Sequence, residues 1–162
     1  MKRGFTLMEI LIYVSVLAII FLAVYSFLDW AVKLSAKAGA IREVTDNARR
    51  AMEIMTHEIR SAKSVYEPTS GASQLSLETG NYLPNGETSS YIDFYLCGQA
   101  SSTICFKKES QNPIAITSDK VNVTGFKFIQ LSTTTPSIQI SLSLDYKQAS
   151  INSTSSASLR PY

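Results

Sequence analysis

The chain has 162 residues, enough for one ordinary domain and too few for two of typical size. Fifteen Lys and Arg residues against thirteen Asp and Glu residues give a net charge of +2. This balance argues against direct nucleic-acid binding, which needs a concentrated basic surface. Two cysteines and one histidine are too few for a zinc site with four Cys or His ligands.

The first predicted element is an apolar stretch of nineteen residues, Ile10 to Leu28, without a charged side chain. As a helix it would cover about 28 Å, close to the roughly 30 Å hydrocarbon core of a bilayer. A helix that is apolar on every side needs lipid or other helices around it. Because Lys2 and Arg3 precede the stretch, we expect a cytoplasmic N-terminus, with everything after Trp30 outside.

A secretory signal peptide is the alternative interpretation of this stretch. The stretch is longer than the usual hydrophobic region of a signal peptide, and no clear small-x-small cleavage site follows it. Glu9 lies at its edge, where an ionised carboxylate costs on the order of 2–3 kcal/mol. Either Glu9 reaches water at the cytoplasmic interface, or a cation neutralises it inside a membrane or a dry assembly.

The residues around Glu9 indicate which cation would neutralise it. Lys2-Arg3-Gly4-Phe5-Thr6-Leu7-Met8-Glu9 resembles the cleavage and methylation site of type IV prepilins and of the pseudopilins of type II secretion. The resemblance implies that a prepilin peptidase cuts between Gly4 and Phe5, which removes a leader containing Lys2 and Arg3. The same enzyme would then methylate the new amine of Phe5.

Glu9 lies one helical turn after Phe5, at position i+4 on the same helix face. In a filament, the Glu9 carboxylate of an incoming subunit would meet the Phe5 amine of a neighbour. Two costly buried charges would then neutralise each other, and the pairing would favour one axial offset between subunits.

The resemblance also implies a domain organisation, a location and a set of partners. Residues 1–4 would be the leader, 5–30 the transmembrane and assembly helix, and 31–162 an extracytoplasmic globular domain. The protein would sit in the bacterial inner membrane as a single-pass protein before it enters an extracytoplasmic filament. Its partners would be the prepilin peptidase, other pilin or pseudopilin subunits, the inner-membrane assembly platform and the lipid bilayer.

A second helical pattern predicts an amphipathic helix over residues 36–67. Apolar residues recur at spacings of three and four from Ile41 to Tyr66, and the other faces carry opposite charges four residues apart. Pro68 and Gly71 are expected to end this helix. A coiled coil or helical bundle is the alternative to packing on the chain's own strands.

Short alternating runs after Pro68 predict strands between residues 74 and 147. The clearest run covers residues 137–146. Its alternation indicates one buried face and one solvent-exposed face, which is typical of an antiparallel sheet. The expected fold class is therefore α+β, with a long N-terminal helix packed on an antiparallel β-sheet, as in pilins. The Ser- and Thr-rich residues 148–158 are expected to form a loop. Further strands are expected at residues 74–78, 90–96, 103–107, 114–117, 121–124 and 126–129.

Cys97 and Cys105 enclose a short loop between two predicted strands. Outside the cytoplasm the pair is expected to oxidise, and the bond would stabilise the hairpin by roughly 2–3 kcal/mol. Two buried free thiols are the alternative.

No pattern predicts a catalytic site, a cofactor or a metal site. His57 is better explained as a solvated residue on a charged helix face than as a general base. No nucleophile elbow organises the many serines, and no Gly-rich phosphate loop is present in the sequence. No dense cluster of Asp and Asn favours calcium.

Two further features favour a minor subunit. Residues 47–62 and the ending Ser158-Leu159-Arg160 resemble minor pilins and J-type minor pseudopilins. Many major pilins carry a proline in the second half of the stem helix, whereas this chain has none between Gly4 and Pro68. The hypothesis is a minor pilin or pseudopilin that assembles into, or initiates, a type IV pilus-like or type II secretion filament. The alternatives are a membrane-anchored extracytoplasmic binding protein that does not polymerise and an anchored enzyme.

Overall fold

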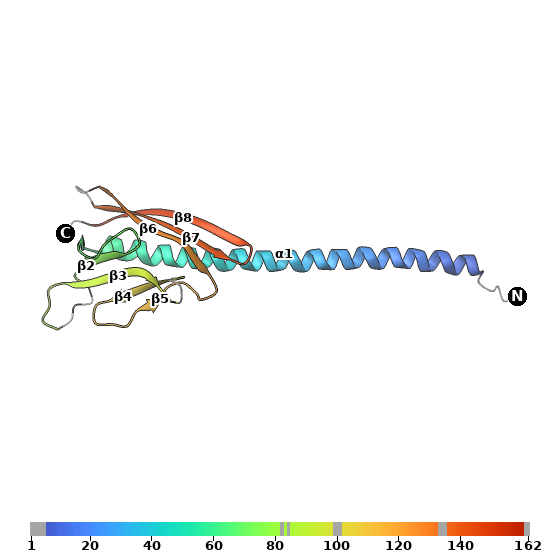
Figure 1. Ribbon diagram of the computed structural model, residues 1–162, viewed down its shortest axis with the longest axis horizontal. Coiled ribbons are helices and arrows are strands. Elements are labelled where there is room, and N and C mark those ends of the chain that lie inside the picture. Colours follow the sequence, from blue (N-terminus) through green and yellow to red (C-terminus); the bar gives the residue numbers. More distant parts are fainter. Residues whose placement is uncertain (1–5, 82, 84, 99–101, 133–135, 161–162) are drawn as a thin grey trace. The chain divides into compact units, whose positions relative to one another are not determined.

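A computed structural model of the chain describes residues 6–81, 83, 85–98, 102–132 and 136–160 (Figure 1). The chain divides into two compact units, residues 1–39 and residues 40–162. The helix α1 (Leu7–Ser61) contributes to both units. The strands β1 to β8 belong to the second unit.

The first unit is helical from Leu7 onward and has no core of its own. None of its described residues is buried, although most of them are apolar. A helix is the structure expected here because it satisfies its backbone hydrogen bonds internally, which an apolar environment requires.

In the second unit, α1 presents one buried stripe. The stripe includes small alanines, and their size lets strands approach the helix closely. Ile41, which the sequence pattern places in the stripe, is 48% exposed, and Ala40 takes the buried position instead. The buried apolar residues of α1 are Ala40, Val44, Ala48, Ala51, Met52, Met55 and Ile59.

The prediction that the helix extends over residues 36–67 is wrong at its C-terminal end. α1 ends at Ser61, and β1 (Ser64–Val65) follows after two residues. The Lys63 N–H donates to the Glu78 carbonyl, 2.8 Å away, and so begins the pairing of β1 with β2. The helical spacing of apolar residues continues past Ser61, but the chain pairs as a strand there instead. Val65 of β1 is β-branched and favours the extended backbone.

Five strands form an antiparallel sheet in sequence order. The β2–β3 and β3–β4 pairs are the longest ladders of this sheet, and the two edge strands have two residues each. Short edge strands of this kind limit unwanted pairing with other chains. The strands are β1 (Ser64–Val65), β2 (Leu75–Thr79), β3 (Ser90–Cys97), β4 (Thr103–Lys108) and β5 (Ile114–Ala115).

The second sheet has three antiparallel strands: β6 (Asn122–Ser132), β7 (Ser137–Tyr146) and β8 (Ala149–Ser158). The two runs expected at residues 121–129 join into the single strand β6, whose register shifts between Val123 and Gly125. A Cβ atom at Gly125 would lie 3.0 Å from the Ser143 Oγ atom, a tight contact that glycine avoids.

The expectation of a loop over residues 148–158 is also wrong. β8 pairs with β7 over ten residues, starting at the turn Lys147–Gln148. Lys147 adopts a φ of 53°, which lets the chain reverse in two residues. The Ser and Thr residues favour a loop by composition, but Ala149 and Ala157 are buried and β-branched Ile151 packs against the core.

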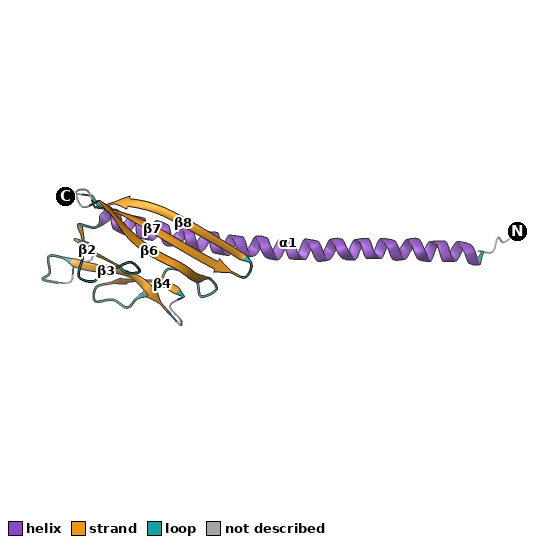
Figure 2. Ribbon diagram, turned by 45° about the horizontal axis from the view of Figure 1, so that its top comes forward, coloured by secondary structure: helices purple, strands orange, loops and turns teal. Residues whose placement is uncertain are grey.

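The two sheets and the helix from Ala40 onward share one hydrophobic core. Figures 1 and 2 show β6–β8 along one flank of this part of α1 and β2–β5 along the other. On β7 the predicted alternation is confirmed, with Ile138, Ile140, Leu142 and Leu144 buried. The α+β fold, a long N-terminal helix packed on antiparallel strands, is confirmed, with two sheets in place of one.

Candidate functional site

Thr6 caps the N-terminus of α1. Its hydroxyl oxygen accepts a hydrogen bond from the Glu9 N–H at 3.3 Å, and its carbonyl accepts from the Glu9 and Ile10 N–H groups at 3.1 and 3.3 Å. Thr-x-x-Glu is the sequence of a capping box, in which the first side chain satisfies an otherwise unpaired helix donor. The helix therefore begins at Leu7, within the motif that resembles a processing site.

Glu9 lies in the first turn of α1, where a negative charge is favoured by the helix dipole. Its carboxylate accepts a 3.3 Å hydrogen bond from the Tyr13 hydroxyl and forms no ion pair among the described residues. Lys2, Arg3, Gly4 and Phe5 lie outside the described residues. The proposed roles of these four residues, and the pairing of Glu9 with the Phe5 amine, therefore stay predictions.

The apolar surface that follows Glu9 is exposed all round the helix. Large apolar side chains from Leu7 to Leu34 are at least about half exposed, and α1 is long and apolar enough to cross a membrane. The hydroxyls of Ser15 and Ser26 donate to the Ile12 and Leu22 carbonyls at 2.8 and 2.9 Å. The two serines thus satisfy their polar groups within the helix, as an apolar environment requires.

The apolar stretch ends in groups that suit a membrane–water interface. Asp29 and Lys33 form an i,i+4 ion pair at 2.7 Å, and the rings of Phe27 and Trp30 lie 6.1 Å apart. Aromatic residues and charges gather at the level of the lipid headgroups. The helix therefore fits a single-pass membrane anchor.

Cys97 and Cys105 form a disulfide bond in the structure, with their Cα atoms 5.7 Å apart. Cys97 ends β3, and Cys105 lies in β4 opposite Tyr95. The bond therefore joins the two strands near the turn between them, where Gly98 adopts a φ of 82°. A disulfide at this place holds the β3–β4 hairpin at its open loop.

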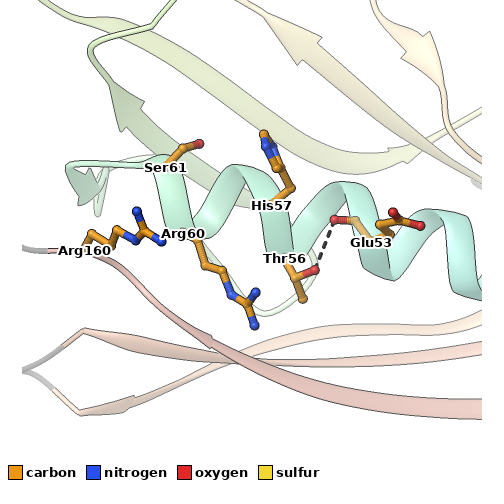
Figure 3. Close-up of a pocket in the computed structure, with 6 residues that line it drawn as sticks. All are labelled: Glu53, Thr56, His57, Arg60, Ser61 and Arg160. Carbon is orange, nitrogen blue, oxygen red and sulfur yellow. Dashed lines mark hydrogen bonds between the residues drawn. The ribbon is translucent and has the colours of Figure 1, made fainter.

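His57 lies in a cleft of about 380 Å³ at the C-terminal end of α1 (Figure 3). His57 is exposed, and no hydrogen bond joins it to another described residue. Among the residues that the structure describes, no group of three or more His, Cys, Asp or Glu could hold a metal ion. The described residues that line the cleft are Glu53, Thr56, His57, Arg60, Ser61 and Arg160.

Two residues of the segments that resemble minor subunits have structural roles that sequence reasoning missed. The Asn47 side-chain oxygen accepts a hydrogen bond from the Ser118 N–H at 2.7 Å, which ties α1 to the segment before β6. Leu159 is 6% exposed and packs in the core. Asn47 and Leu159 therefore hold distant segments against α1 and the core, and only the folded chain shows these contacts.

Residues 1–25 match the family model described as the prokaryotic N-terminal methylation motif. No curated protein and no solved structure matches the chain. The motif is typical of pilin-type structural proteins, which a prepilin peptidase processes and which assemble with other pilins. Followed by an exposed apolar helix and an α+β domain with a pilin-like arrangement, the motif supports a type IV pilin-like protein of the pilin and pseudopilin class.

Proposed function

We propose that the chain is a minor pilin or pseudopilin that assembles into, or initiates, a type IV pilus-like or type II secretion filament. The observation that carries the proposal is the methylation motif over residues 1–25, together with an apolar helix whose side chains no described residue of the chain covers. Such a surface needs lipid before assembly and neighbouring helices after it.

In this proposal the peptidase cuts after Gly4, methylates the amine of Phe5 and leaves Thr6 as the cap of the mature helix. Residues 5–30 are the membrane and assembly helix, and residues 31–162 lie outside the cytoplasm. The Glu9 carboxylate pairs with the Phe5 amine of a neighbouring subunit. The absence of proline between Gly4 and Pro68, and the likeness of residues 47–62 to minor subunits, support the minor role.

The experiment that tests the proposal is the mass and N-terminal sequence of the protein isolated from its cells. We expect a chain that begins with N-methylated Phe5. Gly4→Val should block cleavage because the peptidase site then carries a β-branched side chain at the cut. Gly39→Val is the matched control, since it makes the same substitution far from the proposed cut and a Cβ at Gly39 meets no atom within 4 Å.

Two outcomes would contradict the proposal. A chain that retains its first four residues, or that begins elsewhere than Phe5, overturns the processing step. Normal processing together with absence of the protein from sheared filaments favours instead a membrane-anchored binding protein that does not polymerise.

A further inference from the structure

The cleft at the end of α1 brings together two arginines that lie 100 positions apart in the sequence, Arg60 and Arg160. Arg60 belongs to the last turn of α1. Arg160 is placed by Leu159, whose side chain is buried and whose N–H donates to the Pro136 carbonyl at 3.0 Å. Figure 3 shows the Arg160 side chain extending toward the last turn of the helix.

The negative end of the helix dipole favours cations at this position. Neither arginine, however, forms an ion pair with any residue that the structure describes, and the same is true of Glu53 in the cleft. Two exposed guanidinium groups therefore line one cleft, and neither has an ion-pair partner among the described residues. A bound anion would supply that partner.

The hydroxyl groups of the cleft are already engaged. Thr56 donates to the Met52 carbonyl at 2.7 Å, and Ser61 donates to the Glu58 carbonyl at 3.1 Å. Since these two donors are used within the helix, the side-chain donors left for a ligand are the N–H groups of the two arginines and of His57. Guanidinium groups bind planar oxyanions through paired N–H···O bonds.

We propose that this cleft is a binding site for a carboxylate group, held by Arg60 and Arg160. The two arginines and Glu53 carry a combined formal charge of +1, which matches a carboxylate better than a doubly charged phosphate. The volume of about 380 Å³ exceeds that of one carboxylate group, so the cleft also has room for the chain that carries it. The carboxylate comes from a small free acid or from an acidic side chain of a neighbouring protein.

The single histidine of the chain gives a direct probe, because His57 lines the cleft and its imidazole protons are unique in the spectrum. The full chain in detergent micelles is titrated with sodium acetate at constant ionic strength, with sodium chloride as the balancing salt. We expect a saturable change in the His57 chemical shifts with acetate and none with chloride. Inorganic phosphate should bind no more tightly than acetate.

Arg160→Gln and Arg60→Gln should each weaken acetate binding about tenfold or more, since each removes charge-assisted hydrogen bonds. Arg49→Gln is the matched control, because Arg49 is exposed on the same helix and does not line the cleft. Its dissociation constant should equal that of the unchanged protein. Circular dichroism checks that all three variants keep the fold.

A second ligand distinguishes the two sources of the carboxylate. N-acetylglutamate amide, which mimics an acidic side chain in a peptide, should bind more tightly than acetate if the cleft receives a neighbouring protein. Equal binding of the two ligands supports a small free acid. Shifts that do not saturate, affinities that survive both arginine substitutions, or tighter binding of phosphate would overturn the proposal.

Discussion

Glu9 has a structural role that does not depend on a neighbouring subunit. Its N–H donates to the Thr6 hydroxyl, and its carboxylate accepts from Tyr13 within the same helix. The local contacts explain why an acid is tolerated in the first turn of α1. They leave its charge unpaired among the described residues, so the charge is available for an assembly contact.

Glu9→Gln separates the charge of this side chain from its hydrogen bond. The amide oxygen still accepts from Tyr13, but the negative charge is lost. If assembly depends on pairing with an amine, Glu9→Gln and Glu9→Ala should both reduce incorporation into filaments, while cleavage after Gly4 stays largely intact. Immunoblots of sheared filaments and of membranes measure both effects. Normal incorporation of Glu9→Gln would show that charge pairing does not set the register.

Glu78 predicts how acid affects the stability of the second unit. Hydrogen bonds from the Ser89 and Ser64 hydroxyls, at 2.6 and 2.8 Å, lower the pKa of the Glu78 carboxyl below its usual value, and Lys63 adds to this effect. A lowered pKa in the folded state means that the ionised carboxylate stabilises the fold above the unfolded pKa of 4.5. This contribution is lost as the pH falls through the lower folded pKa.

The corresponding variant is Glu78→Gln. It should lower the free energy of unfolding at pH 7 by about 1 kcal/mol, a modest value because the side chain is only partly buried. The loss should be smaller at pH 3, where Glu78 is largely protonated in the unfolded chain. Thermal unfolding at both pH values measures the difference. Glu87→Gln, at an exposed position, is the control and should change the free energy of unfolding little at either pH. An equal loss for Glu78→Gln at pH 3 and pH 7 would show that ionisation of Glu78 does not stabilise the fold.

At the scale of single elements, the sequence predicts the bounds of an element best where the spacing of its apolar residues matches the face that is buried. The strict alternation from Ser137 to Tyr146 predicts β7 with its bounds, because one face of that strand is buried and the other is not. The end of α1 is missed because the helical spacing continues beyond Ser61, while pairing of Lys63 with Glu78 decides the structure. That pairing joins segments 15 positions apart, which local spacing does not reveal.

β8 is missed for a different reason. Its residues are mostly Ser and Thr, so its alternation carries little hydrophobic contrast. The strand forms because β7 offers it a ten-residue ladder and because Ala149 and Ala157 are buried at its two ends. The candidate sites differ in the same way. The motif around Gly4 and Glu9 can be recognised from neighbouring residues in the sequence. The cleft lined by Arg60 and Arg160 forms only when the chain folds, because these residues lie far apart in the sequence.

The disulfide supports the β3–β4 hairpin. Replacing Cys97 and Cys105 together by Ser should lower the free energy of unfolding by about 2–3 kcal/mol, because the unfolded chain regains the freedom of the closed loop. Chemical denaturation of the full chain in detergent measures the loss. A reducing agent should produce the same loss in the unchanged protein and none in the variant. Equal stability of the two proteins under oxidising conditions would mean that the bond adds no stability.

At the scale of the whole molecule, the two units differ in where their apolar surface is covered. Every buried residue of the hydrophobic core lies at position 40 or later. Residues 7–39 expose their large apolar side chains and bury none. The second unit can therefore stabilise itself, while the first needs lipid or other helices.

The division predicts that residues 40–162 fold without the stem. Such a fragment keeps the complete core, including Ala40 and Val44 at the start of the buried stripe. It should be soluble without detergent and unfold cooperatively on heating, as measured by circular dichroism. A fragment that begins at Arg49 loses three buried side chains, Ala40, Val44 and Ala48, and should be less stable by a few kcal/mol. If the longer fragment unfolds without cooperativity, the stem must contribute to the stability of the domain. If both fragments are equally stable, the buried stripe before Arg49 does not support the core.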